Sequence, residues 1–525
     1  MKRNYAFILA LSCAFVPVAF GQAAPQQQQK SAPPPPKTAQ ESPAQRQKQK
    51  NALDQITIPP LPAFHPREPR RFVLPNGLVV FLQENHELPI IGGTMRFRGG
   101  DVDVPASKIG LTDIYGSVWR TGGTKQRTGD ELDDFLEARA AKVETSSSEE
   151  STSISFNSLK EDFDTVFPVF RELLAQPEFR EDKIDLVKRQ IFGIISRRND
   201  DVDEIAGRES AKLAYGAQNP YARVAEYATV AAVTRQDLLD WHAKYVRPDN
   251  AMLGIYGDFD PAKMEALIHE SFGSWGTPLK APKKPATPRK PIKANVQFNP
   301  AVPGLYFIPK EDVDQSSIQM VTLGIERDNP DYFAVSVMNE VLSGGFASRL
   351  FSNLRTKEGL AYAVGGGVGS DWDHLGIQGY SIATKSSNTA KAIDGLKEQL
   401  VGMVTNPPDE NELKIAKDNI LNSFVFRFDS KQKVLAEQMT YDFYGYPSDY
   451  LERYRTAIEK VTPADVKRVA EKYLHPDKLA VLVVGNPIEI GDQLTKMGQV
   501  KTIDITIPQP PGAPASAAGG QPQQH

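Results

Sequence analysis

The sequence predicts a mixed α/β (α+β) fold with two homologous lobes, each a mixed sheet flanked by helices. Three observations support this prediction. The chain has 525 residues, more than one hydrophobic core usually serves. Segments with helical periodicity alternate with strand-like segments along the chain. A segment near residue 240 is also repeated near residue 470.

The repeat is an ungapped match between residues 233–257 (VTRQDLLDWHAKYVRPDNAMLGIYG) and residues 461–485 (VTPADVKRVAEKYLHPDKLAVLVVG). Both copies predict the same local structure. A threonine caps a helix that has an aspartate in its first turn. A Pro-Asp pair then ends the helix, and an apolar run predicts a buried strand that ends at glycine. We therefore expect a long-period duplication with lobes at residues 64–277 and 294–507.

Each block mixes both kinds of element. In the first block, strand patterns occur at residues 78–83 and 92–97, which we expect to be joined by a turn, and at residues 151–157. Helical patterns follow at residues 130–142, 162–175 and 182–198. In the second block, strands are predicted at residues 320–324, 361–368 and 377–382, and helices at 331–342, 347–357, 390–404 and 411–428. This mixture in both blocks gives the α/β class.

Three other segments lack apolar periodicity. Residues 22–63 are rich in Gln and Pro and predict a disordered tether, and residues 508–525 predict a similar tail. Residues 278–293 contain six Lys or Arg, five Pro and no acidic residue, which predicts an extended linker between the lobes. The net charge of -4 argues against a nucleic-acid-binding role.

Residues 1–21 predict a secretory signal peptide. Lys2 and Arg3 form its charged n-region, and a mostly apolar run follows. Small residues occupy the positions that a signal peptidase requires for cleavage. A membrane anchor is the alternative, but the run is short and is interrupted by Pro17. We therefore expect export to the periplasm or envelope, with no transmembrane span after signal removal.

The only cysteine, Cys13, lies inside this signal segment. A small residue precedes it, as in lipoprotein signals, but Ala10 stands where such signals usually have Leu. We therefore expect no lipid anchor at Cys13. After cleavage the chain has no cysteine, which excludes disulfides, thiolate catalysis and Cys-type zinc sites.

Two long motifs resemble a known family. R-F-V-L-P-N-G-L-V-V-F-L-Q-E-N-H-E-L-P (residues 71–89) resembles the opening strand of the pitrilysin/insulinase-like metallopeptidases, which include the mitochondrial processing peptidase. S-G-G-F-A-S-R-L-F-S-N-L-R-T-K-E-G-L-A-Y (residues 343–362) resembles their second-lobe signature. The resemblance covers nearly all of residues 64–506. It implies two lobes, in one chain or in two, that face each other like a clamshell around a chamber for a peptide.

The amphipathic helix predicted within residues 110–124 lies where this family carries its inverted zinc motif, H-x-x-E-H. Here Asp113 replaces the first ligand histidine, Gly116 the general-base glutamate and Ser117 the second ligand histidine. The family's third ligand, a glutamate on a later helix, falls at or near Ile194. No H-x₃-H pair occurs elsewhere. Because zinc needs about three protein ligands, we expect this chain to bind no metal or other cofactor. A metal site assembled from distant residues is the alternative.

The second-lobe motif is intact. Arg355 and Tyr362 match the pair that, in the family, binds the substrate backbone near the scissile carbonyl. A guanidinium donates to carbonyl oxygens without losing its charge, and a phenol can donate to an oxygen that gains negative charge. We expect Arg355 near a helix end and Tyr362 at the start of the next strand, with Gly359 between them. A purely structural alternative pairs Arg355 with Glu358 and buries Tyr362 in the core.

The resemblance implies a non-zinc subunit of a secreted heterodimeric metallopeptidase, inactive on its own. A zinc-bearing homologous chain would be the partner, and an extended peptide would be the substrate. The alternative is a non-enzymatic structural or peptide-binding scaffold of the same fold. A self-sufficient peptidase is a third hypothesis, and it requires zinc on this chain.

Asp373 and His374 are expected in a surface loop of the second lobe.

Overall fold

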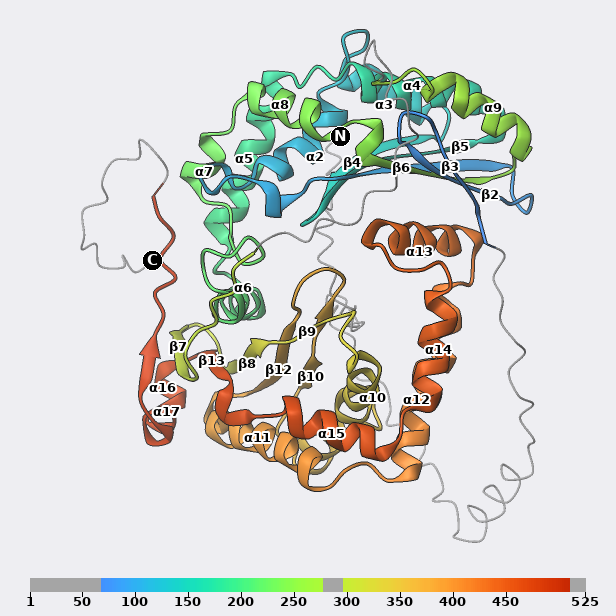
Figure 1. Ribbon diagram of the computed structural model, residues 1–525. Coiled ribbons are helices and arrows are strands. Elements are labelled where there is room, and N and C mark those ends of the chain that lie inside the picture. Colours follow the sequence, from blue (N-terminus) through green and yellow to red (C-terminus); the bar gives the residue numbers. More distant parts are fainter. Residues whose placement is uncertain (1–67, 277–295, 510–525) are drawn as a thin grey trace, which may run out of the picture. The chain divides into compact units, whose positions relative to one another are not determined.

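The computed structural model describes residues 68–276 and 296–509 (Figure 1). The predicted signal peptide with Cys13, the tether, the linker, and residues 510–525 of the predicted tail lie outside the described residues. Those predictions therefore stay predictions. Within the two described ranges, no helix has both the length and the apolar character that a membrane span needs.

The first lobe contains a six-stranded mixed sheet in the order β1-β2-β6-β3-β5-β4. Only β2 and β6 pair in parallel. The strands are β1 (Arg70–Val73), β2 (Val79–Glu84), β3 (Ile90–Arg98), β4 (Lys142–Ser147), β5 (Ser151–Leu159) and β6 (Ala251–Gly257). The helices are α2 (Leu111–Thr121), α3 (Gly129–Glu137), α4 (Phe163–Ala175), α5 (Glu181–Arg197), α6 (Val202–Tyr215), α7 (Tyr227–Ala231), α8 (Arg235–Tyr245) and α9 (Pro261–Phe272).

The second lobe contains a six-stranded sheet in the order β10-β12-β8-β13-β7-β14 and a small two-stranded sheet of β9 and β11. The strands are β7 (Gly304–Pro309), β8 (Gln315–Leu323), β9 (Ile325–Glu326), β10 (Ala363–Val368), β11 (Ser370–Asp371), β12 (Ile377–Lys385), β13 (Ala480–Gly485) and β14 (Val500–Thr502). The helices are α10 (Tyr332–Ser343), a π-helix (Phe351–Lys357), α11 (Thr389–Thr405), α12 (Glu410–Phe424), α13 (Lys431–Tyr444), α14 (Tyr450–Lys460), α15 (Pro463–Tyr473), α16 (Pro487–Ile490) and α17 (Gln493–Met497).

The two large sheets share one topology, which confirms two homologous α/β lobes. Strands β2, β6, β3, β5 and β4 of the first sheet correspond in order and direction to β7, β13, β8, β12 and β10 of the second. The repeated segment also folds alike in both. Thr234 caps α8 and Thr462 caps α15, each in a reciprocal hydrogen-bonded box with an aspartate, Asp237 or Asp465. The sheets differ at the edge, where β1 runs antiparallel to β2 but β14 runs parallel to β7.

Each large sheet packs its two faces against different helices, because side chains alternate between faces along a strand. In the first sheet, Val80 and Leu82 belong to the main core together with residues of α2 and α4. Phe81, between them in sequence, faces the other way and packs with side chains of helix α13: Leu435, Met439 and Phe443. The first sheet is therefore covered on that face by a helix of the second lobe.

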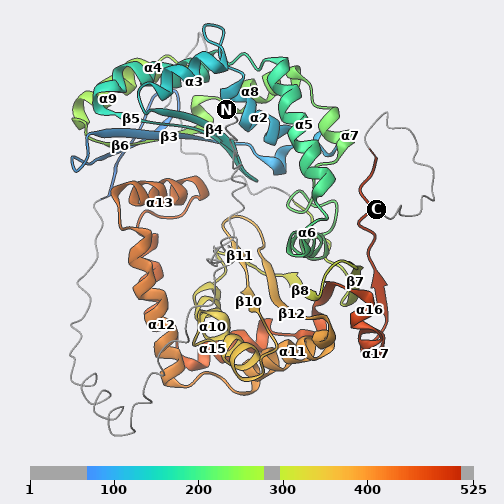
Figure 2. The same ribbon diagram turned by 180° about the vertical axis from the view of Figure 1, so that it is seen from behind.

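The second sheet shows the reciprocal arrangement. Leu482 and Val484 of β13 pack with Ile205 and Leu213 of α6, a helix of the first lobe. Figures 1 and 2 show α13 against the first sheet and α6 against the second. Each lobe thus contributes one helix to the other lobe's core, which ties the two halves together through apolar packing.

Strands β2 and β3 are joined by the short connection 85–89, as the sequence predicts, and β6 lies between them in the sheet. Three local predictions need correction. The helix predicted at residues 130–142 ends at Glu137, and β4 begins at Lys142. The helix predicted at residues 347–357 is a π-helix over Phe351–Lys357. The helix predicted at residues 411–428 gives way to a 3₁₀ turn after Phe424.

Candidate functional site

Helix α2 carries the positions of the family's zinc motif. It begins after Gly110, whose φ of 100° is a left-handed conformation that favours glycine. Asp113 is an exposed residue of this helix. The surrounding protein removes water from its carboxyl, and this desolvation, together with the charge of nearby Asp101, raises the pKa of the carboxyl to about 7. Of the described residues, one group of three His, Asp or Glu side chains lies close enough to share a metal ion, and Asp113 does not belong to it.

Gly116 lies in direct contact with strand β4. A Cβ atom placed there would lie 2.8 Å from the backbone nitrogen of Ser147 and 2.9 Å from its Oγ. The hydroxyl of Thr145 on the same strand donates to the Gly116 carbonyl over 2.6 Å. Helix and strand are therefore too close to admit any larger residue at 116 unless the backbone moves. The glutamate that the family uses at this position does not fit here.

Helix α2 is also held in place by the half-buried His242. The Nε2–H of His242 on α8 donates to the Leu174 carbonyl over 2.9 Å, so Nδ1 accepts from the Tyr115 hydroxyl, also at 2.9 Å. Burial lowers the pKa of His242 to about 4, which keeps the ring neutral. Both ring nitrogens are occupied by protein groups, so this histidine holds α2 in place and is not a free ligand.

The position of the third zinc ligand is also unsuitable. Ile194 lies on α5, is 55% exposed and offers no atom that could bind a metal ion. Ser117 is half-buried one residue after Gly116. The residues at all four positions, Asp113, Gly116, Ser117 and Ile194, do not fit a zinc ion of the family's kind.

The second-lobe motif places Arg355 and Tyr362 where the sequence predicts. Arg355 lies in the last turn of the π-helix, and Gly359 has a φ of 62°, which makes the turn that follows. Tyr362 immediately precedes β10 and pairs with the neighbouring strand, its amide donating to the Ala383 carbonyl over 2.9 Å.

Both side chains of the motif are exposed. Tyr362 is 61% exposed, so it does not fill the core. Arg355 lies against the Phe351 ring, 4.8 Å from its centroid, and no carboxylate in the described parts of the chain pairs with it. Glu358 instead lies 3.8 Å from Lys391. The structural alternative for this pair is therefore wrong in both of its parts.

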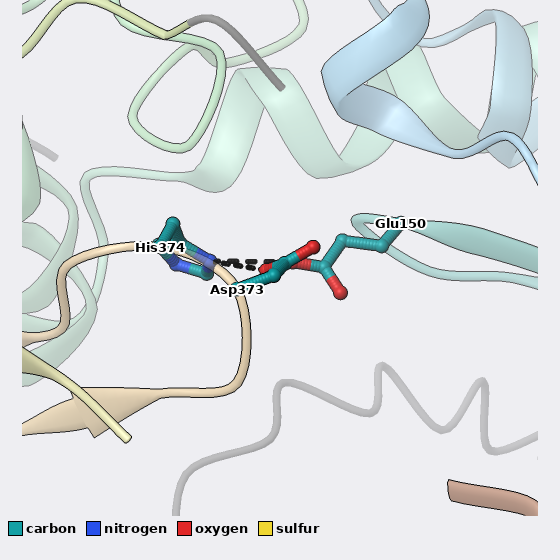
Figure 3. A group of neighbouring side chains, drawn as sticks. All are labelled: Glu150, Asp373 and His374. Atoms are coloured by element: carbon teal, nitrogen blue, oxygen red, sulfur yellow. Dashed lines mark hydrogen bonds and ion pairs between the residues drawn. The ribbon is translucent and has the colours of Figure 1, made fainter. Parts of the chain in front are cut away.

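A second cluster of functional side chains was not predicted. The turn between β4 and β5 carries Glu150, and the connection between β11 and β12 carries Asp373 and His374 (Figure 3). His374 Nδ1 lies 3.2 Å from a Glu150 oxygen and 3.1 Å from an Asp373 oxygen. His374 is only 8% exposed, so the expectation of a surface loop residue was wrong. No spacing pattern in the sequence indicates that these residues of the two lobes lie close together.

The surroundings of this cluster are aromatic and acidic. The Tyr221 ring stacks on His374, with centroids 3.7 Å apart, and the Tyr444 hydroxyl donates to Glu150. Burial alone lowers the pKa of His374, but hydrogen bonds to Asp373 and Glu150 and the charge of Asp371 raise it to about 10. The carboxylates therefore favour a positive charge at the imidazole.

The fold and these positions define a class: a two-lobed, peptidase-like α/β protein whose zinc helix lacks its ligands and whose Arg/Tyr motif is exposed. Comparisons with known proteins agree. The insulinase (peptidase family M16) model matches residues 120–209, beginning beyond Ser117, and the peptidase M16 inactive domain model matches residues 232–420. The chain belongs to the M16 family, which confirms the resemblance, and it is a homologue without the zinc motif.

Relatives and solved structures lie at low identity. A protein named non-peptidase homolog YmxG from Helicobacter pylori is 24% identical over 414 residues, 78% of this chain and 91% of the relative. An uncharacterized zinc protease of Mycobacterium leprae is 23% identical, over 67% of this chain and 77% of the relative. A crystal structure described as a peptidase M16 inactive domain from Pseudomonas fluorescens has a TM-score of 0.67 at 23% identity, covering 80% of this chain and 98% of that chain. At this identity, the similarity to that structure shows a shared fold and nothing more.

Proposed function

We propose that this chain is the non-zinc subunit of a secreted heterodimeric metallopeptidase. Its role is to bind an extended peptide and to orient the scissile carbonyl for a homologous chain that carries the H-x-x-E-H motif. The observation that carries the proposal is the contrast between the two lobes. Gly116 packs against β4 where the catalytic glutamate would stand, whereas Arg355 and Tyr362 are exposed and free of carboxylate or core partners among the described residues.

The chemistry of the pair suits this role. The Arg355 guanidinium presents several N–H donors and stays charged, so it can hold backbone carbonyl oxygens of a peptide. The Tyr362 hydroxyl can donate to the carbonyl oxygen as negative charge develops on it. Strands β4 and β10 end their sheets, so either could pair with an extended peptide through backbone hydrogen bonds. The chain itself would supply no catalytic zinc.

Co-expression with an H-x-x-E-H homologue from the same organism, followed by a peptide-cleavage assay, tests the proposal. Arg355→Ala and Tyr362→Phe should each lower turnover by about 10²–10³-fold, as loss of one transition-state donor does. Lys357→Ala is the matched control, because Lys357 is an exposed cation in the same π-helix. Full activity in both motif variants would refute the role given to the pair.

The second candidate is a non-enzymatic scaffold or peptide-binding protein. It is favoured by the likeness to the Helicobacter pylori relative named a non-peptidase homolog. Affinity purification from the native cell envelope separates the candidates, because a scaffold would be recovered in a complex without an H-x-x-E-H chain. N-terminal sequencing of that material also tests the proposed export, which requires a new terminus close to residue 22.

A further inference from the structure

We propose that Glu150, Asp373 and His374 form a binding site for one divalent transition-metal ion that joins the two lobes. The site is separate from the zinc position of the family and uses none of the α2 residues. It does not depend on the proposed function. Its ligand atoms are His374 Nδ1, one Glu150 oxygen and one Asp373 oxygen, and all three lie within 4.8 Å of one another.

The spacing of the ligand atoms supports a common ion. Ions such as Zn²⁺ bind imidazole nitrogen and carboxylate oxygen at about 2.0–2.2 Å, which places neighbouring ligand atoms about 2.8–3.6 Å apart in octahedral or tetrahedral geometry. The two separations from Nδ1, 3.2 Å to Glu150 and 3.1 Å to Asp373, fall in this range. In Figure 3 both carboxylates point toward the same edge of the imidazole ring.

The arrangement of charge also supports an ion. Both carboxylates face a single ring nitrogen, which can carry one proton at most. Asp371 adds a third carboxylate 3.6 Å from the other ring nitrogen, Nε2. A divalent ion would displace the proton from Nδ1, which is released to solvent. Both carboxylate oxygens would then coordinate the ion, and it would relieve the repulsion between Glu150 and Asp373. One nitrogen with two oxygens suits zinc, manganese or iron better than calcium, which prefers oxygen alone.

The surrounding residues hold the ligands in place. Tyr221 stacks flat on the His374 ring, which fixes the plane of the imidazole. Glu150 also accepts from the Tyr444 hydroxyl, and the Tyr215 hydroxyl donates to the Leu375 carbonyl next to His374 over 2.8 Å. Such supporting contacts orient metal ligands in proteins. Because Glu150 belongs to the first lobe and His374 to the second, a bound ion would cross-link the lobes.

The test is metal titration of the full chain, stripped with a chelator and held at pH 8. Zn²⁺ binding is measured by calorimetry and by metal content after dialysis, and Co²⁺ absorption reports the ligand set. We expect one equivalent per chain, and at least tenfold weaker binding in Glu150→Gln and in His374→Gln. Glu149→Gln is the matched control, since it removes the same charge from the adjacent residue and should weaken binding less than threefold.

Three results would overturn the proposal. The first is no stoichiometric Zn²⁺ in the wild-type chain, which would mean that the cluster holds only a protonated histidine. The second is equal weakening by Glu149→Gln and Glu150→Gln, which would indicate diffuse attraction. The third is full binding in His374→Gln. If the variants do not fold, X-ray absorption of the wild-type complex decides, because the site requires one imidazole nitrogen and carboxylate oxygens around the ion.

Discussion

Replacing Gly116 with alanine should destabilise the protein, although alanine is the better helix former. The new Cβ would approach the Ser147 backbone nitrogen to 2.8 Å and the Ser146 carbonyl carbon to 3.1 Å. Both atoms belong to β4, so relief requires a shift between helix and strand. Overpacking of this kind costs about 1–3 kcal/mol, and the helix propensity of alanine returns about 0.5–1 kcal/mol. We expect the free energy of unfolding to fall by about 1 kcal/mol, within a range of about 0–2.5 kcal/mol.

The measurement is urea unfolding followed by circular dichroism. Gly193→Ala is the matched control, because Gly193 lies in helix α5 and its Cβ would meet nothing within 4 Å. That variant should be neutral or stabilised by up to about 1 kcal/mol. Equal stability of the two variants would show that the contact with β4 is not tight and would remove the main argument that the zinc position is closed.

The other predictions concern different parts of the chain. The pKa of His242 is lowered from 6.5 to about 4, and each unit of pKa corresponds to about 1.4 kcal/mol. The contribution of His242 to the free energy of unfolding should therefore be fully present above pH 6.5 and fall by about 3 kcal/mol by pH 4. Chemical unfolding across this range should show this loss of stability in the wild type and not in His242→Gln. Burial raises the pKa of Asp331, but hydrogen bonds from Lys472, Arg468 and Tyr473 lower it to about 2. The contribution of Asp331 to the free energy of unfolding is therefore present above pH 3.8 and disappears toward pH 2. Asp331→Asn should cost about 1–2 kcal/mol at neutral pH because its cationic partners are half-exposed, and an unchanged unfolding midpoint would contradict this. Met439→Ala should cost about 2–4 kcal/mol and increase hydrogen exchange in β6, since Met439 packs over Gly254; unchanged exchange there would argue against the shared core.

Much of the fold was predictable because it depends on local patterns. Apolar periodicity located the central strands and most long helices, and the threonine caps of α8 and α15 were correct in both copies of the repeat. Strand pairing was not predictable at β2 and β3. Strand β6 comes from residues far along the chain and inserts between them, and no short-range pattern reports such an insertion.

The candidate site was predictable only in part. Sequence comparison with the family located Asp113, Gly116, Ser117 and Ile194 as lost zinc positions, and the helix–turn–strand geometry of the Arg/Tyr motif followed from its glycine. The approach of Gly116 to β4 was not visible, because it depends on the distance between a helix and a strand. The burial of His374 was missed because its neighbours come from distant segments.

The sequence by itself determined the two-lobed α/β architecture, the family and the loss of zinc ligands, since each depends on residue identity and spacing. Only the tertiary structure decided that α6 and α13 are shared between the lobes, that β4 excludes a side chain at residue 116, and that Glu150 meets His374. The physical reason is the distance along the chain over which each interaction acts. Periodicity and capping act over a few residues, whereas packing and ion pairing depend on separations in space that the chain sets only when it is folded.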